Sequence, residues 1–125
     1  METSAVKVLI IDDEEDICLM LEECLKDEYK EEVEIKTFLD AKDAIDYIKT
    51  NALDIIITDM NFPQFSGRDI IREAQKINGS TKGVLVTGES GDEVAKYAHD
   101  SGLYLLRKPF NFDEFINLVA PFIRR

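Results

Sequence analysis

Carboxylate, hydroxyl and ammonium side chains follow four short apolar runs of this chain. Asp12 and Asp13 come after VKVLII, Asp59 after DIIIT, Thr87 after GVLV and Lys108 after LYLLR. If these runs are neighbouring parallel strands, their carboxyl ends meet at one edge of one sheet, where ligands of such sheets bind. Carboxylate oxygens are ligands that Mg²⁺ prefers, and a carboxylate can also attack phosphorus. The pattern therefore indicates binding of a divalent metal and movement of a phosphoryl group.

The rest of the chain supplies the elements that must position these residues. Five apolar runs, expected as strands, alternate with five amphipathic runs, expected as helices. The strands are expected at residues 6–11, 33–38, 54–58, 83–86 and 103–107, and the helices at 14–26, 40–50, 67–77, 91–101 and from 112 onwards. Such alternation predicts an α/β fold with a doubly wound parallel sheet, in a single domain of residues 1–125.

The composition of the chain argues against some classes of binding partner. Charged residues make up 33% of the chain and the net charge is −11, so its field would repel nucleic acid and an anionic membrane surface. Cys18 and Cys24 lie six apart in a helical pattern and point in opposite directions, which favours reduced thiols. The first residues lack the order of a signal peptide and no apolar run is long enough to span a bilayer. We therefore expect no nucleic-acid or membrane partner and a cytoplasmic location.

Four motifs carry a resemblance to a known family. IIDDEED spans the end of the first expected strand, TDMNFPQFSG that of the third, VTGES that of the fourth and RKPF that of the fifth. In this order, over essentially the whole chain, they resemble the receiver domain of two-component response regulators. The resemblance implies the flavodoxin-like (βα)5 receiver fold, with a five-stranded sheet of order 2-1-3-4-5. It also implies a signalling switch that catalyses only its own phosphorylation and dephosphorylation, not an enzyme that acts on other substrates.

The same resemblance implies a role for each carboxylate. Asp59 is the expected nucleophile, which takes a phosphoryl group from a histidine kinase or histidine phosphotransfer protein and holds it as an acyl phosphate. Mg²⁺ is the expected cofactor, bound directly by Asp13, Asp59 and the backbone carbonyl of Asn61, and by Asp12 either directly or through water. Three clustered carboxylates repel one another, and a cation that prefers oxygen ligands relieves this repulsion.

Lys108 and Thr87 are expected to bind the phosphoryl oxygens. Lys108 acts as a point charge, and by resemblance its peptide bond to Pro109 is cis. Thr87 donates its hydroxyl once Asp59 is modified, and Gly88 leaves room for the group. Phosphorylation adds about one negative charge and three acceptor oxygens. In the family this changes the surface formed by the fourth helix, the fifth strand and the fifth helix, which an unknown downstream protein is expected to read.

The sequence departs from the family at the fifth strand. The position three residues before the lysine is usually Tyr or Phe in the family, but here it is Leu105. Tyr104 stands one residue earlier, and because side chains alternate along a strand it would face the other side. Either a bulge returns Tyr104 to the switch position or the domain signals without this aromatic residue. We expect the second.

Two other functions fit the same fold less well. An aspartyl-phosphate phosphatase of the haloacid dehalogenase type needs an Asp two residues after its nucleophile, where this chain has Asn61. A flavin carrier needs a loop rich in Ser, Thr or Gly after the first strand, where IDDEED would repel the phosphate. An interaction module that works without phosphorylation is the remaining alternative, and the missing aromatic residue is the reason to retain it.

Overall fold

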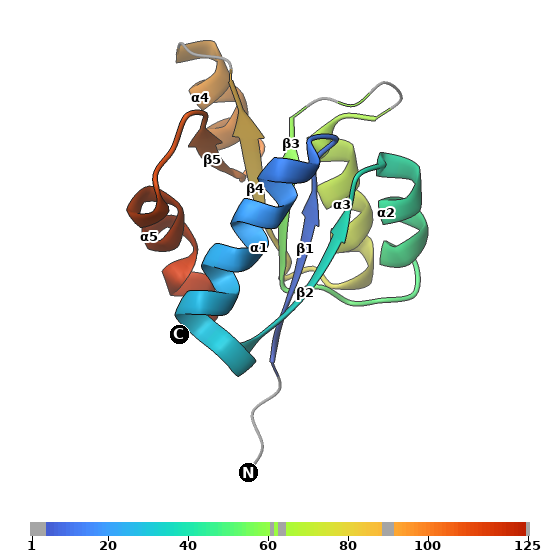
Figure 1. Ribbon diagram of the computed structural model, residues 1–125. Helices are drawn as coiled ribbons and strands as arrows, with labels where there is room; N and C mark the ends of the chain where they lie inside the picture. The colour runs from blue at the N-terminus through green and yellow to red at the C-terminus, as the bar shows by residue number, and fades with distance from the viewer. Residues whose placement is uncertain (1–4, 61, 63–64, 89–91, 125) are drawn as a thin grey trace.

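The computed structural model describes residues 5–60, 62, 65–88 and 92–124. Its strands are all parallel and form one sheet in the order β2-β1-β3-β4-β5 (Figure 1). The strands are β1 (Val6–Ile11), β2 (Val33–Phe38), β3 (Ile55–Asp59), β4 (Lys82–Thr87) and β5 (Tyr104–Arg107). The helices are α1 (Glu15–Tyr29), α2 (Ala41–Ile48), α3 (Gly67–Ile77), α4 (Asp92–Asp100) and α5 (Phe112–Ile123). The predicted fold class and strand order are confirmed.

The sheet separates two apolar cores. Val8 and Ile10 of β1 face the core beneath α1 and α5, whereas Leu9 and Ile11 face the core beneath α2, α3 and α4 (Figure 1). Successive strand residues point to opposite faces, so a strand covered on both sides must be apolar at nearly every position. This burial explains why the central strands appear in the sequence as continuous aliphatic runs.

Helix α1 is longer than its pattern predicted. The pattern ended the helix at Lys26, but α1 continues to Tyr29, and Lys30–Glu32 form a short 3-10 turn. Tyr29 is buried and extends the inward stripe of Leu21 and Leu25, each four residues apart. Even so, none of the helices within the described part of the chain is long and apolar enough to cross a bilayer.

Polar side chains begin three of the helices. Asp40 accepts hydrogen bonds from the backbone N–H groups of the first turn of α2, and Asn111 accepts one from Glu114 of α5. Ser66 and Asp69 form a reciprocal capping box at the start of α3. The sequence SGDE from Ser90 onwards is a capping signal for α4 as well, but Ser90 falls outside the described residues. These caps fix where α2, α3 and α5 begin after their strands, and thereby set the loops around the carboxyl edge of the sheet.

Candidate functional site

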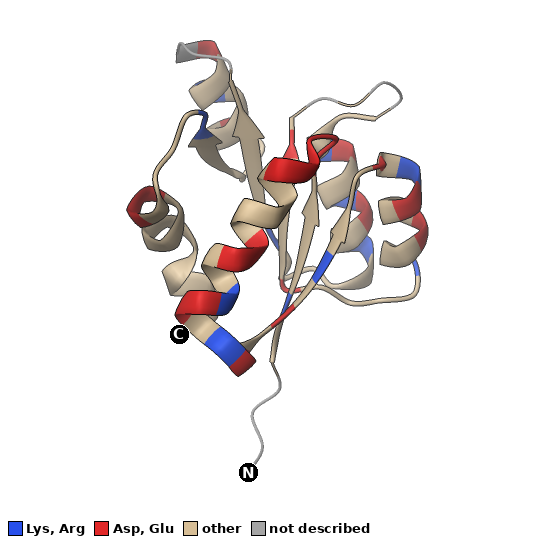
Figure 2. Ribbon diagram, viewed as in Figure 1, with Lys and Arg blue, Asp and Glu red and all other residues tan. Residues whose placement is uncertain are grey.

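Three carboxylates come together beyond the carboxyl ends of β1 and β3. Asp12 and Asp13 follow β1, Asp59 is the last residue of β3, and one ligand oxygen from each lies within 4.8 Å of the others. The parallel register pairs Ile11 of β1 with Thr58 of β3, so Asp12 is level with Asp59. Acidic segments at the start of α1 and the end of β3 accordingly meet at the top of the molecule (Figure 2).

The three carboxylates differ in exposure and in their hydrogen bonds. Asp12 is 1% exposed, Asp59 is half-buried and Asp13 is exposed. The backbone N–H of Glu14 donates to Oδ1 of Asp12 at 2.9 Å, and that of Met60 donates to Oδ1 of Asp59 at 2.9 Å. Each of these two carboxylates is thus held through its Oδ1 by the backbone. Among the described residues, none donates a hydrogen bond to Oδ2 of Asp59.

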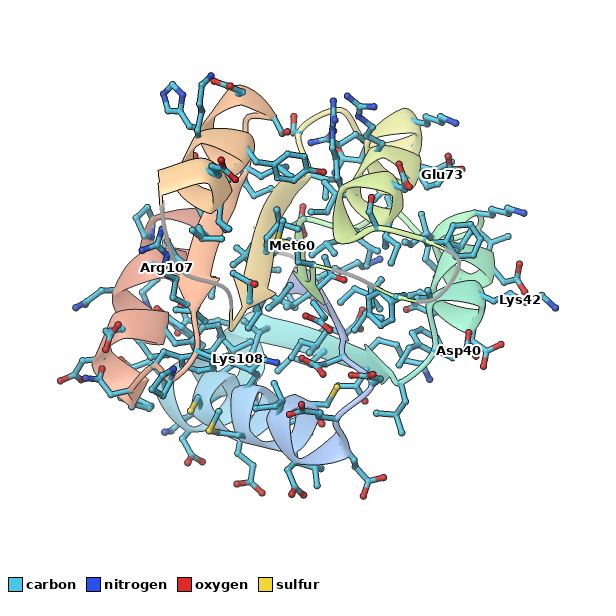
Figure 3. The ribbon with its side chains drawn as sticks, turned by 90° about the horizontal axis from the view of Figure 1, so that it is seen from above. Asp40, Lys42, Met60, Glu73, Arg107 and Lys108 are labelled. Atoms are coloured by element: carbon cyan, nitrogen blue, oxygen red, sulfur yellow. The ribbon has the colours of Figure 1, made fainter. Side chains whose placement is uncertain are left out.

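Lys108 brings a positive charge to the carboxylate cluster. Its Nζ lies 3.5 Å from Oδ2 of Asp12, and its backbone N–H donates to the carbonyl oxygen of Thr87 at 2.7 Å. Seen from above, Lys108 points inward from the end of β5, whereas its neighbour Arg107 points outward (Figure 3). The cis peptide bond implied for Lys108–Pro109 is confirmed.

Thr87 lies beside this cluster, at the carboxyl end of β4. Its side chain is buried, and the register pairs Asp59 with Val86, one residue before Thr87. A Cβ built on Gly88 would meet no atom within 4 Å, so the backbone after Thr87 has open space beside it. The structure therefore brings together five predicted site residues, Asp12, Asp13, Asp59, Thr87 and Lys108. The sixth, Asn61, falls outside the described residues.

Burial is the main electrostatic cost of this arrangement. It raises the pKa of both Asp12 and Asp59 above the ordinary value of 3.8. The backbone N–H bonds and Lys108 partly offset the shift, while repulsion between carboxylates adds to it. A hard cation would remove both the repulsion and part of the cost of burial. The all-oxygen donor set and its excess of negative charge therefore fit Mg²⁺.

These raised pKa values predict how stability depends on pH and on Mg²⁺. A carboxyl whose pKa is higher in the folded chain keeps its proton longer there, so its contribution to stability falls as pH rises through the folded pKa. We expect Mg²⁺ to raise the free energy of unfolding much more near pH 8 than near pH 4, where protons already neutralise the site. The measurement is urea unfolding with and without Mg²⁺. An equal Mg²⁺ effect at both pH values would contradict the prediction.

Gly67 packs directly against the backbone of Asp59. A Cβ at this position would lie 2.4 Å from the carbonyl oxygen of Asp59 and 2.8 Å from Cδ2 of Leu85. The sequence singled out Gly67 as part of a motif, but a residue without a side chain gives no sign of what approaches it. This close approach is what allows α3 to begin beside the candidate phosphoryl acceptor.

Gly67→Ala is therefore expected to be costly. We expect a loss of about 1–3 kcal/mol in the free energy of unfolding, because the new methyl group meets backbone that cannot turn aside. Gly79→Ala is the matched control, since a Cβ there meets nothing within 4 Å, and its effect should stay within about 0.5 kcal/mol. Urea unfolding measures both, and equal effects of the two changes would contradict the assignment.

The fifth strand carries no bulge. Its pairing with β4 is continuous from Tyr104, opposite Val84, to Arg107, opposite Thr87. Tyr104 lies against Phe122 of α5, with ring centroids 4.8 Å apart, whereas Leu105 packs into the core beneath α2, α3 and α4. The expectation that Tyr104 faces away from the switch position is confirmed.

Comparisons with known proteins agree with this geometry. A family model described as the response regulator receiver domain matches residues 8–120. The response regulator ArlR of Staphylococcus saprophyticus is 28% identical over 122 residues, which cover 95% of this chain and 53% of that protein. The ArlR proteins of Staphylococcus aureus match to the same extent. The chain thus spans about half the length of these curated relatives.

Solved structures share the fold over nearly the whole chain. The response regulator DrrB, an OmpR/PhoB homologue of Thermotoga maritima, superposes with a TM-score of 0.83 at 26% identity, covering 97% of this chain and 54% of that one. The chemotaxis response regulator CheY4 of Vibrio cholerae gives a TM-score of 0.78 at 25% identity, covering 94% and 98% of the two chains.

Proposed function

Since the chain belongs to the family of response regulator receiver domains, we propose that it is a phosphoryl-accepting switch of a two-component system. Asp59 is the acceptor, and the donor is the phosphohistidine of a kinase or phosphotransfer protein. The observation that carries the proposal is the convergence of Asp12, Asp13 and Asp59 within 4.8 Å of one another, with the ammonium of Lys108 3.5 Å from Asp12.

The proposed reaction uses the side chains in distinct ways. One carboxylate oxygen of Asp59 attacks phosphorus, and the phosphorus–nitrogen bond of the donor breaks with its electron pair left on the imidazole. Lys108 interacts with the phosphoryl oxygens as charge builds on them, and Thr87 donates its hydroxyl to the bound group. Attack by water on the acyl phosphate releases phosphate and restores Asp59, so the domain catalyses both halves of its own cycle.

Mg²⁺ belongs to this proposal as the resident cofactor. Asp12, Asp13 and Asp59 would hold it, together with the carbonyl of Asn61 that the family resemblance implies. When bound, Mg²⁺ supplies neutralisation of the charge on the transferred oxygens. The readout of the switch is a changed surface over α4, β5 and α5, recognised by an unidentified downstream protein. The cytoplasmic location stays a prediction from the sequence.

The test is chemical modification of the native protein. Incubation with acetyl phosphate and Mg²⁺ should add the mass of one phosphoryl group, which hydroxylamine removes and which peptide mapping places at Asp59. Chelation of Mg²⁺ should prevent the modification. An unmodified protein, or a phosphoryl group mapped to another residue, would exclude the proposed role of Asp59.

One observation favours a second function. No aromatic residue of β5 faces α4, because Tyr104 turns to α5 and Leu105 takes the opposite face. A receiver that binds its partner without phosphorylation has no need of that aromatic residue. If this were the function, affinity for the partner would be the same for the phosphorylated and unphosphorylated protein, whereas the switch requires the two affinities to differ.

An exposed apolar groove beside Lys108 suits docking of the donor protein. Ile17 and Met20 of α1 line it together with Lys108, Pro109 and Phe110 of the segment after β5. Met20 is 39% exposed and forms part of this contiguous apolar lining. The groove includes Lys108 itself, so a protein bound in it is close to the carboxylate cluster.

Met20→Lys is expected to slow phosphoryl transfer from a protein donor but not from acetyl phosphate. We expect phosphoryl transfer from a histidine kinase, chosen by phosphotransfer profiling, to slow by about 5- to 100-fold, the usual effect of losing a central apolar contact. Modification by acetyl phosphate should be unchanged. Ile77→Lys is the matched control, because Ile77 is also exposed, at 49%, but is the last residue of α3 and lies outside the groove. Equal slowing by both variants would contradict docking at this groove.

A further inference from the structure

Strand β5 places no aromatic residue next to α4 that could respond to the state of Asp59. The strand next to α4 contributes Leu105 to the core that α4 covers, and its aromatic residue Tyr104 contacts α5 instead. A leucine has no polar group and no ring with which to change partners. A contact between α4 and an element next to Asp59 would give α4 a route to the acceptor that does not use β5.

Such a contact joins α4 to α3. The guanidinium carbon of Arg68 lies 5.7 Å from the ring centroid of Tyr97, within the range of a cation–π interaction. Arg68 is the second residue of α3, and Tyr97 is in the middle of α4. Both side chains are half-buried, and Tyr97 also packs on the core that contains Leu85, Ala98 and Leu103. Partial burial strengthens the contact relative to one in open solvent.

The contact leaves Arg68 incompletely satisfied. Its Nε is buried, and no described residue accepts a hydrogen bond from it. A buried donor without an acceptor costs free energy. Nε thus contributes no hydrogen bond that would fix the guanidinium in its place against the ring of Tyr97.

Arg68 is linked to Asp59 through Gly67, the residue before it in the chain. Gly67 lies against the carbonyl oxygen of Asp59, and its backbone N–H donates to the carbonyl oxygen of Met60 at 2.8 Å. The first turn of α3 is thus bound to the residues that must adjust when a phosphoryl group is attached to Asp59. A displacement there is passed to Arg68 without an intervening flexible segment.

We propose that the contact between Arg68 and Tyr97 couples Asp59 to α4, in place of an aromatic residue on β5. Phosphorylation of Asp59 moves the first turn of α3, and the change in the Arg68–Tyr97 contact alters the position or mobility of α4. This coupling rests on the proposed function, because it needs a modified Asp59 as its input. The coupling is reciprocal, so a change that breaks the contact must also change how tightly the site binds a phosphoryl group.

The test measures both ends of the coupling in the same proteins. Beryllofluoride with Mg²⁺ serves as a stable mimic of the phosphoryl group, and hydrogen exchange of the backbone amides of residues 92–100 reports on α4. Arg68→Gln removes the cation and Tyr97→Leu removes the ring. Tyr97→Phe keeps the ring, and Arg72→Gln removes a cation from an exposed position one turn further along α3.

The expected size follows from the strength of a partly exposed cation–π contact. Arg68→Gln and Tyr97→Leu should each reduce the response of α4 to beryllofluoride by about two- to fivefold. The apparent affinity of each variant for beryllofluoride should change by a similar factor. The double variant should be no worse than either single one. Tyr97→Phe and Arg72→Gln should behave like the wild type. Retention of the full α4 response in Arg68→Gln and Tyr97→Leu would overturn the coupling.

The design separates failure of the coupling from failure of the proposed function. Acetyl phosphate labelling of the same samples shows whether Asp59 is modified. A wild-type protein that is labelled at Asp59 but whose α4 does not respond contradicts the coupling alone. A wild-type protein that is not labelled contradicts the proposed function, and the coupling falls with it.

Discussion

Asp59→Asn is expected to abolish phosphoryl transfer and at the same time to stabilise the fold. The amide can still accept the hydrogen bond from Met60, but it is a poor nucleophile, so labelling by acetyl phosphate should fall by more than about 10³-fold. The change also removes one of three clustered carboxylates, whose burial and mutual repulsion raise the pKa of Asp59. Without Mg²⁺, we expect the free energy of unfolding to rise by about 0.5–2 kcal/mol.

Glu23→Gln is the control for this stabilisation. It lowers the net negative charge by the same amount, on an exposed face of α1 outside the carboxylate cluster. If relief of general repulsion were the cause, both variants would gain stability equally. If Asp59→Asn gains stability and Glu23→Gln does not, the electrostatic cost lies in the carboxylate cluster. The gain of Asp59→Asn should also disappear when it is compared with the wild type in the presence of Mg²⁺. A destabilised Asp59→Asn protein would contradict the electrostatic argument.

The fold and the meeting of the carboxylates were predictable because they follow from local patterns and one topological rule. Continuous aliphatic runs such as VKVLII identify strands covered on both faces, and the polar residues after them lie at the carboxyl edge of a parallel sheet. Alternation along a strand was enough to predict that Tyr104 and Leu105 face opposite sides. The register with β4 was needed to exclude a bulge.

What the sequence did not predict depends on residues distant along the chain. The last turn of α1 is present because Tyr29 is buried, with the guanidinium of Arg124 lying 4.8 Å from its ring centroid. Nothing in the polar stretch around Tyr29 indicates that contact. The close approach of Gly67 to Asp59 and the contact between Arg68 and Tyr97 are of the same kind, since each joins elements that only the folded sheet brings together.

Lys108→Met is expected to slow transfer while leaving the metal site intact. Lys108 is the cation next to the carboxylates and lowers the pKa of both Asp12 and Asp59. Without it, both pKa values rise further and the phosphoryl oxygens lose a positive partner. We expect the rate of labelling by acetyl phosphate to fall by about 10²- to 10³-fold, the usual cost of removing one group that stabilises developing charge.

Affinity for Mg²⁺ distinguishes this role of Lys108 from a general loss of the site. A lysine beside a metal-binding cluster repels the metal, so Lys108→Met should bind Mg²⁺ as tightly as the wild type or more tightly. Lys96→Met is the matched control, because Lys96 is an exposed lysine of α4 that pairs with Asp100 away from the cluster. It should change neither rate nor affinity. If Lys108→Met lost Mg²⁺ binding together with labelling, its effect would be that of a damaged pocket, and the assigned contact with the phosphoryl oxygens would be wrong.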